Sequence, residues 1–161
     1  MIIKALVDED FANYKLPSMF IITAFCSFKC EKESGVRCCQ NSDLANAESH
    51  EVSNGWLVKR YAQNPITKAI VFGGLEPMDQ FDDVLDIVKR LGASGFKKTP
   101  IVIYTGYTED EIGDERIKQL SESKDNIIVK FGRFIPGQHP HYDKILGIDL
   151  ASDNQYAKRI S

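Results

Sequence analysis

The chain has 161 residues, 43% of them hydrophobic, which is enough to bury the core of a single domain, 1–161. Its formal net charge is −3 and no long basic stretch occurs, so nucleic acid is not expected as a main partner. The apolar run 19–26 is far shorter than the roughly 20 residues of a membrane span. It also lacks the features of a signal peptide. We therefore expect a cytoplasmic protein with reduced thiols and no membrane partner.

The N-terminal third contains the first predicted strands. Residues 1–7 form a short apolar run that is compatible with a strand, and 11–17 form a polar loop that ends at a proline. The segment 18–25 is almost entirely apolar and rich in β-branched residues, which predicts a strand covered on both faces. This strand leads directly to Cys26.

A polar loop, a helix and a second buried strand follow the cysteines. The loop covers 41–48. Residues 53–64 predict a helix, with Ser53 as its N-cap and Pro65 beyond its end. The apolar segment 66–74 predicts the next buried strand, which stops at a pair of glycines.

The clearest helical pattern covers 78–92. Its apolar residues recur at helical spacing and so share one face. They are Phe81, Val84, Leu85, Val88 and Leu91. Gly92 is expected to follow the last turn, where a left-handed residue commonly ends a helix.

The C-terminal half continues the same alternation. Residues 99–107 predict a strand, 108–123 an amphipathic helix with acids in its first turn, and 125–134 a further strand. A last short strand is expected near 144–148. Strands that alternate with helices at this spacing are typical of an α/β fold with a mostly parallel sheet.

Three local signals lie at the carboxyl ends of predicted strands. They are Cys26, the pair Gly73–Gly74 and the pair Thr105–Gly106. Functional groups in parallel α/β sheets gather at the carboxyl ends of the strands. We therefore expect these residues to lie around one site.

All four cysteines lie between residues 26 and 39, in the order Cys26, Cys30, Cys38 and Cys39. A disulfide framework does not fit a reducing compartment. Structural zinc usually takes two separated Cys-x2-4-Cys pairs, whereas the second pair here is adjacent. A redox pair is more often Cys-x2-Cys. These readings and inert buried cysteines remain alternatives to an iron–sulfur cluster, for which thiolates are the soft ligands required.

Five segments occur in order along the chain: "DFANYKLPSMFIITAFC", the cysteine segment ending in "CCQNS", "GGLEP" at 73–77, "VIYTGY" at 102–107, and "FGRFI" followed by "GIDLASDNQ". Together they resemble the radical SAM superfamily, and most closely the small activating subunits of anaerobic ribonucleotide reductase. The corresponding family motifs are Cys-x3-Cys-x2-Cys, Gly-Gly-Glu-Pro and Tyr-Thr-Gly-Tyr. Two departures are plain: eight residues separate Cys30 from Cys39, and Leu75 interrupts the Gly-Gly-Glu sequence.

The resemblance implies a partial, incompletely closed (β/α)6-type barrel with a mostly parallel sheet. It implies a 4Fe-4S cluster on Cys26, Cys30 and Cys39, with Cys38 as the alternative third ligand. The open iron of such a cluster binds S-adenosyl-L-methionine through its amino and carboxylate groups. The implied cofactor-binding residues are Gly73, Gly74, Glu76, Thr105, Gly106 and Asn154.

The implied activity is that of a radical SAM oxidoreductase that generates a glycyl radical. The implied partners are the large catalytic subunit of a glycyl radical enzyme, anaerobic ribonucleotide reductase, and a reductase or flavodoxin-like electron donor. The short chain leaves little for walls around a small substrate, which favours a macromolecular one. Two alternatives stay open: a small radical SAM enzyme with another peptide or small-molecule substrate, and a non-catalytic zinc or iron–sulfur binding module.

Overall fold

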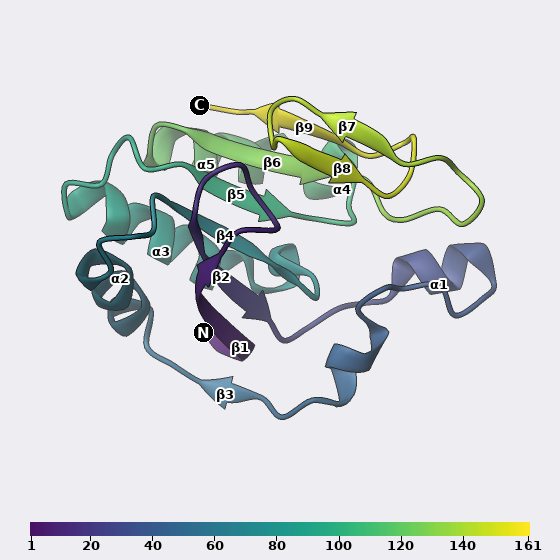
Figure 1. The fold of residues 1–161 in the computed structure, drawn as a ribbon, viewed down its shortest axis with the longest axis horizontal. Coiled ribbons are helices and arrows are strands. Elements are labelled where there is room, and N and C mark those ends of the chain that lie inside the picture. Colours follow the sequence, from purple (N-terminus) through teal and green to yellow (C-terminus); the bar gives the residue numbers. More distant parts are fainter.

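The computed structural model describes residues 1–161 and contains one seven-stranded sheet (Figure 1). In spatial order its strands are β3 (His50–Glu51), β1 (Ile2–Asp10), β2 (Ser18–Thr23), β4 (Ala69–Gly74), β5 (Ile101–Tyr104), β6 (Ile127–Phe131) and β9 (Tyr156–Arg159). The pairs β2–β4, β4–β5 and β5–β6 are parallel, whereas β1, β3 and β9 pair antiparallel at the two edges. The central strands therefore all end at the same edge of the sheet.

Two different layers cover the two faces of the sheet. The helical layer contains α2 (Asn54–Gln63), α3 (Phe81–Ala93) and α5 (Asp114–Ser123). Helices α3 and α5 lie behind the sheet in Figure 1. The other face is covered by the loop 11–17 and by a hairpin of β7 (His141–Asp143) and β8 (Ile148–Leu150). Because strand residues alternate between faces, each central strand contributes to both layers.

Two apolar clusters show this alternation. The larger cluster joins the helices to side chains such as Ile70, Phe72 and Ile103. The smaller cluster lies on the opposite face and joins the loop 11–17 and the hairpin to the sheet. Its members are Tyr14, Ala69, Val71, Val102, Ile128, Leu146, Leu150 and Ala157. The predicted buried strands are thus covered on both faces, as parallel strands normally are.

Most predicted elements are confirmed. Ser53 caps α2, because its side chain accepts a hydrogen bond from Trp56 N at 3.1 Å. The 3₁₀ helix η2 (Pro77–Gln80) precedes α3, and a second one, η1 (Ser42–Asn46), lies in the predicted polar loop. A short helix, α1 (Lys29–Ser34), contains the second cysteine, Cys30, and was not predicted.

Three local expectations are wrong. The single helix expected at 108–123 is two helices, α4 (Glu109–Ile112) and α5, because Gly113 between them has φ 83° and ψ 148°. Gly92 lies inside α3 rather than after it, and a Cβ there would meet Ser123 O at 3.2 Å. The absence of a side chain at residue 92 therefore allows α3 to approach the end of α5 closely.

The third error concerns the strand expected near 144–148. Residues 144–147 form a turn, because the carboxylate of Asp143 accepts hydrogen bonds from Ile145 N and Leu146 N, both at 2.8 Å. The strands of this region are β7 and β8 on either side of the turn, followed by the edge strand β9.

The fold is thus a mixed α/β arrangement whose central sheet does not close on itself. This confirms the α/β class and the incomplete closure; the (β/α)6-type barrel stays a prediction. No helix is long and apolar enough to cross a membrane.

Candidate iron–sulfur site

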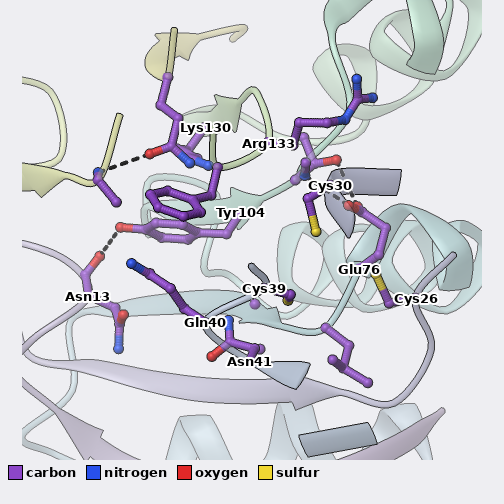
Figure 2. A pocket seen from close by; sticks show the side chains of 18 of the residues that line it. Asn13, Cys26, Cys30, Cys39, Gln40, Asn41, Glu76, Tyr104, Lys130 and Arg133 are labelled. Carbon is purple, nitrogen blue, oxygen red and sulfur yellow. Dashed lines mark hydrogen bonds between the residues drawn. The ribbon is translucent and has the colours of Figure 1, made fainter. Parts of the chain in front are cut away.

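A cavity of about 460 Å³ lies where the central parallel strands end (Figure 2). The strands β2, β4, β5 and β6 all contribute residues to its wall, as do the cysteine segment and the residues that follow β8. The predicted residues that line it are Cys26, Cys30, Cys39, Gly73, Gly74, Glu76, Thr105 and Gly106. The structure therefore brings residues from distant parts of the sequence to one place.

The four cysteines do not share one environment. All four are free thiols. Cys26, Cys30 and Cys39 line the cavity, whereas Cys38 does not. The thiol of Cys38 lies 3.2 Å from Ser34 Oγ and 3.5 Å from the carbonyl oxygen of Cys30. This arrangement favours Cys39 over Cys38 as the third ligand, although iron ligation itself stays a prediction.

The backbone between the first two cysteines turns sharply. Phe28 has the left-handed conformation φ 52° and ψ 41°, which is uncommon for a residue with a side chain. Its amide donates to Cys26 Sγ at 3.3 Å, and its carbonyl accepts from the amides of Glu31 and Lys32 on α1. The turn thus places Cys30 on α1 while Cys26 stays near the end of β2.

Burial keeps the thiols of Cys26 and Cys30 protonated. It raises the pKa of Cys26 to about 11, and burial together with the neighbouring thiols raises the pKa of Cys30 to about 12. Thiolates in such a place need a nearby positive charge, and bound metal ions supply one when they displace the protons. The donor set therefore suits a metal centre better than a nucleophilic thiol.

The geometry does not resemble a site for one ion. No group of three His, Cys, Asp or Glu side chains is close enough to hold a single metal ion. Structural zinc requires four ligands around one point. A cluster of four irons instead takes each thiolate on a separate iron, so its ligands are spread over a larger volume. Three thiols around a cavity fit this second arrangement.

Glu76 is buried, with 5% of its surface exposed, and joins two strand ends. Its Oε1 accepts from Thr105 Oγ1 at 2.7 Å and from Met78 N at 3.0 Å, and its Oε2 accepts from Gly106 N at 2.8 Å. Burial raises its pKa, and these three hydrogen bonds oppose the shift. The inserted Leu75 therefore does not prevent Glu76 from reaching the site, and Glu76 also caps η2.

The glycine pair lies where β4 passes close to β2. Gly74 has φ 84°, and a Cβ there would lie 2.4 Å from Ile22 Cγ2. A Cβ at Gly73 would lie 3.0 Å from the ring of Phe20. Both glycines line the cavity, so their exposed backbone forms part of its wall.

Asn154 is the one predicted cofactor-binding residue that does not line the cavity. Its side chain donates to Arg133 O at 2.9 Å and accepts from Ser152 Oγ at 2.8 Å. Its neighbour Gln155 does line the cavity and donates to Gly132 O at 3.2 Å. Asn154 thus supports the wall from behind, and its predicted contact with a cofactor stays a prediction.

Several lining residues were not predicted from the sequence. Tyr104 donates from its hydroxyl to Asn13 O at 2.5 Å, which ties the loop 11–17 to β5. Lys130 and Arg133 come from β6 and the residues just after it. A lysine inside a buried strand is the one signal in the sequence that could have marked this wall.

The model of a family described as the 4Fe-4S single cluster domain matches residues 18–152. The match begins at β2, contains all four cysteines and ends just after β8. No curated protein matches this chain significantly.

Proposed function

Because the chain belongs to the 4Fe-4S single cluster domain family, we propose that it is a radical S-adenosylmethionine activase, which generates a glycyl radical on a partner enzyme. The observation that carries the proposal is the meeting of three thiols, the glycine pair and the Glu76–Thr105 contact around one cavity. The same motifs, in the same order along the chain, carry its resemblance to the activases of anaerobic ribonucleotide reductase.

The residues have separate roles in this proposal. Cys26, Cys30 and Cys39 hold the cluster and leave one iron without a protein ligand. The chemistry that the cluster supplies is one-electron cleavage of S-adenosylmethionine to methionine and a 5′-deoxyadenosyl radical, which abstracts a hydrogen atom from glycine. The backbone of Gly73 and Gly74 would bind the methionine moiety, and the end of β5 would bind the nucleoside.

The open sheet supports a macromolecular substrate. The sheet does not close, and its β3 edge has only two residues. A cavity in a fold that does not close on itself can admit a loop of a partner protein, whereas a small-molecule enzyme needs walls that exclude water. The partner is then the large subunit of a glycyl radical enzyme, anaerobic ribonucleotide reductase, with a reductase or flavodoxin-like protein as the electron donor.

Product analysis tests the proposal. Protein reconstituted with iron and sulfide without oxygen, then given S-adenosylmethionine and a reductant, should form 5′-deoxyadenosine, and Cys26→Ala should not. Co-incubation with an anaerobic reductase should then give a glycyl radical signal in electron paramagnetic resonance. A cluster without 5′-deoxyadenosine would indicate a binding module. Cleavage without a glycyl radical would indicate a different substrate.

A further inference from the structure

The turn between Cys26 and Cys30 has a strained residue at its centre. Phe28 has a φ of 52°, the left-handed conformation, although it carries a side chain. Its amide donates to Cys26 Sγ at 3.3 Å. A left-handed backbone is unfavourable for a residue with a Cβ and persists only where surrounding contacts hold it. The contacts of its two neighbours, Ser27 and Lys29, therefore decide whether the hydrogen bond to Cys26 is kept.

Both neighbours contact the same side chain, that of Tyr107. Ser27 Oγ lies 3.3 Å from Tyr107 Oη. Lys29 Nζ lies 4.6 Å from the centre of the Tyr107 ring and forms an ion pair with Glu111 at 3.0 Å. An ammonium group over an aromatic ring is attracted by the negative face of the ring. Tyr107 thus contacts the turn on both sides of Phe28.

Tyr107 is itself fixed at three points. Its amide donates to Thr105 Oγ1 at 3.0 Å, and its carbonyl accepts from Gly132 N at 3.1 Å. Its hydroxyl donates to Asp79 Oδ1 at 2.6 Å. Thr105 follows β5, Gly132 follows β6 and Asp79 lies in η2. Tyr107 therefore joins the cysteine turn to the ends of two parallel strands.

The hydrogen bonds of Tyr107 run in one direction. A phenol has a single hydrogen, and Tyr107 gives it to Asp79, so Ser27 is the donor in its contact with Tyr107. A phenylalanine at residue 107 would keep the ring beside Lys29 and leave Ser27 without this acceptor. Tyr107 does not line the cavity, so it acts on the site only through the turn.

We propose that Tyr107 is a positioning residue for the iron–sulfur site, because it holds the turn in the conformation in which the Phe28 amide donates to Cys26 Sγ. Hydrogen bonds to the cysteine sulfurs of a cluster stabilise its reduced, more negative state and so raise its reduction potential. Tyr107 thus sets the potential through Ser27 and Phe28. The ligand role of Cys26 rests on the proposed function, whereas the conformation of the turn rests on these contacts.

Hydrogen exchange of the Phe28 amide, followed by NMR in the full chain without cluster, tests the turn. Tyr107→Phe should speed this exchange by roughly 2- to 10-fold, the factor expected for the loss of one hydrogen bond. Ser27→Ala should give the same increase, and the double variant no further one, because both changes remove the same contact. Tyr61→Phe is the matched control. It removes a tyrosine hydroxyl that donates to Thr99 before β5, and it should leave the exchange unchanged.

Redox titration of the reconstituted proteins, followed by electron paramagnetic resonance, tests the effect on the cluster. At equal iron content, Tyr107→Phe and Ser27→Ala should have a more negative midpoint potential than the wild type, and Tyr61→Phe the same one. Unchanged Phe28 exchange in Tyr107→Phe, or an unchanged potential, would overturn the proposal. Neither measurement uses S-adenosylmethionine, so a failure to form 5′-deoxyadenosine would refute the activase and leave the role of Tyr107 intact.

Discussion

The carboxylate of Glu76 lies 2.7 Å from Thr105 Oγ1 and so fastens the end of β4 to the end of β5. Both residues are buried. The two strands are parallel neighbours, and each enters the wall of the cavity at its carboxyl end. Thr105 and Gly106 are therefore held by Glu76, and the three residues form one structural unit.

Glu76→Gln should destabilise this unit. A glutamine has one acceptor oxygen and one donor group, so at least one of the three donors around residue 76 would face another donor. A buried donor left without a partner costs about 1–3 kcal/mol of unfolding free energy. Chemical denaturation should show this loss for Glu76→Gln, and a smaller one for Thr105→Val. A Glu76→Gln variant as stable as the wild type would contradict the account.

Gly74→Ala should be more damaging than Gly95→Ala. Both glycines have a positive φ, 84° and 88°, but a Cβ at Gly95 would meet nothing within 4 Å. Gly95→Ala thus measures the conformational cost alone, about 1–2 kcal/mol. Gly74→Ala adds the clash with Ile22, which should cost a further ~1–3 kcal/mol. Equal unfolding free energies for the two variants would show that β2 moves away without cost.

Stability should depend on pH through Lys130. Burial lowers its pKa to about 8 from the ordinary value of 10.5. Between these pH values the unfolded chain keeps a proton that the native protein has lost, so the unfolding free energy rises with pH. The increase in unfolding free energy that comes from Lys130 is up to about 3 kcal/mol and is complete above pH 10.5. It is lost as the pH falls through 8.

Lys130→Met isolates this contribution, because other groups also titrate in the same range. The rise in unfolding free energy between pH 8 and 10.5 should be smaller in the variant than in the wild type. Urea denaturation at several pH values measures both slopes. Parallel slopes would mean that Lys130 is not desolvated in the native protein.

We expect ion pairs, rather than packing in the apolar core, to hold the cysteine segment (26–39) in place. Helix α1 contains no buried residue. Glu33 on α1 pairs with Arg133 at 2.9 Å, and Lys29 pairs with Glu111 at 3.0 Å. Glu33→Gln should change global stability by less than about 1 kcal/mol and speed hydrogen exchange in residues 29–34 by about 2- to 5-fold.

The matched control for that prediction is Glu122→Gln, whose exposed partner Lys118 lies at 3.9 Å on α5. It should not alter exchange in residues 29–34. If the two variants gave the same exchange rates there, the ion pairs of Arg133 would not hold α1 in place.

The sequence predicts the central strands well because each is a continuous apolar run, such as 18–25 and 66–74. It does not predict the fold around Asp143, where one side chain fixes the turn through two backbone amides. It also places the end of α3 wrongly, because Gly92 serves a contact with Ser123 that lies 31 residues away. A local sequence pattern reports the structural preferences of neighbouring residues. These errors come instead from contacts that form only in the folded chain.

The site was predictable where residues lie at the carboxyl end of a buried strand, as Cys26, Gly73 and Thr105 do. Arg133 was missed because nothing in its immediate neighbours marks a cavity wall, whereas the one signal for Lys130 is its position inside an apolar strand. The adjacent positions of Cys38 and Cys39 cannot decide between them either. Only the fold shows that one thiol lines the cavity and that the other lies beside Ser34.

The most direct test of the central claim is the iron and acid-labile sulfide content of anaerobically reconstituted wild type, Cys38→Ala and Cys39→Ala. We predict about four irons and four sulfides per chain in the wild type and in Cys38→Ala, and loss of most of both in Cys39→Ala. The opposite behaviour of the two variants would show that Cys38 is the third ligand. A colourless wild type with one zinc and no sulfide would contradict the iron–sulfur site itself.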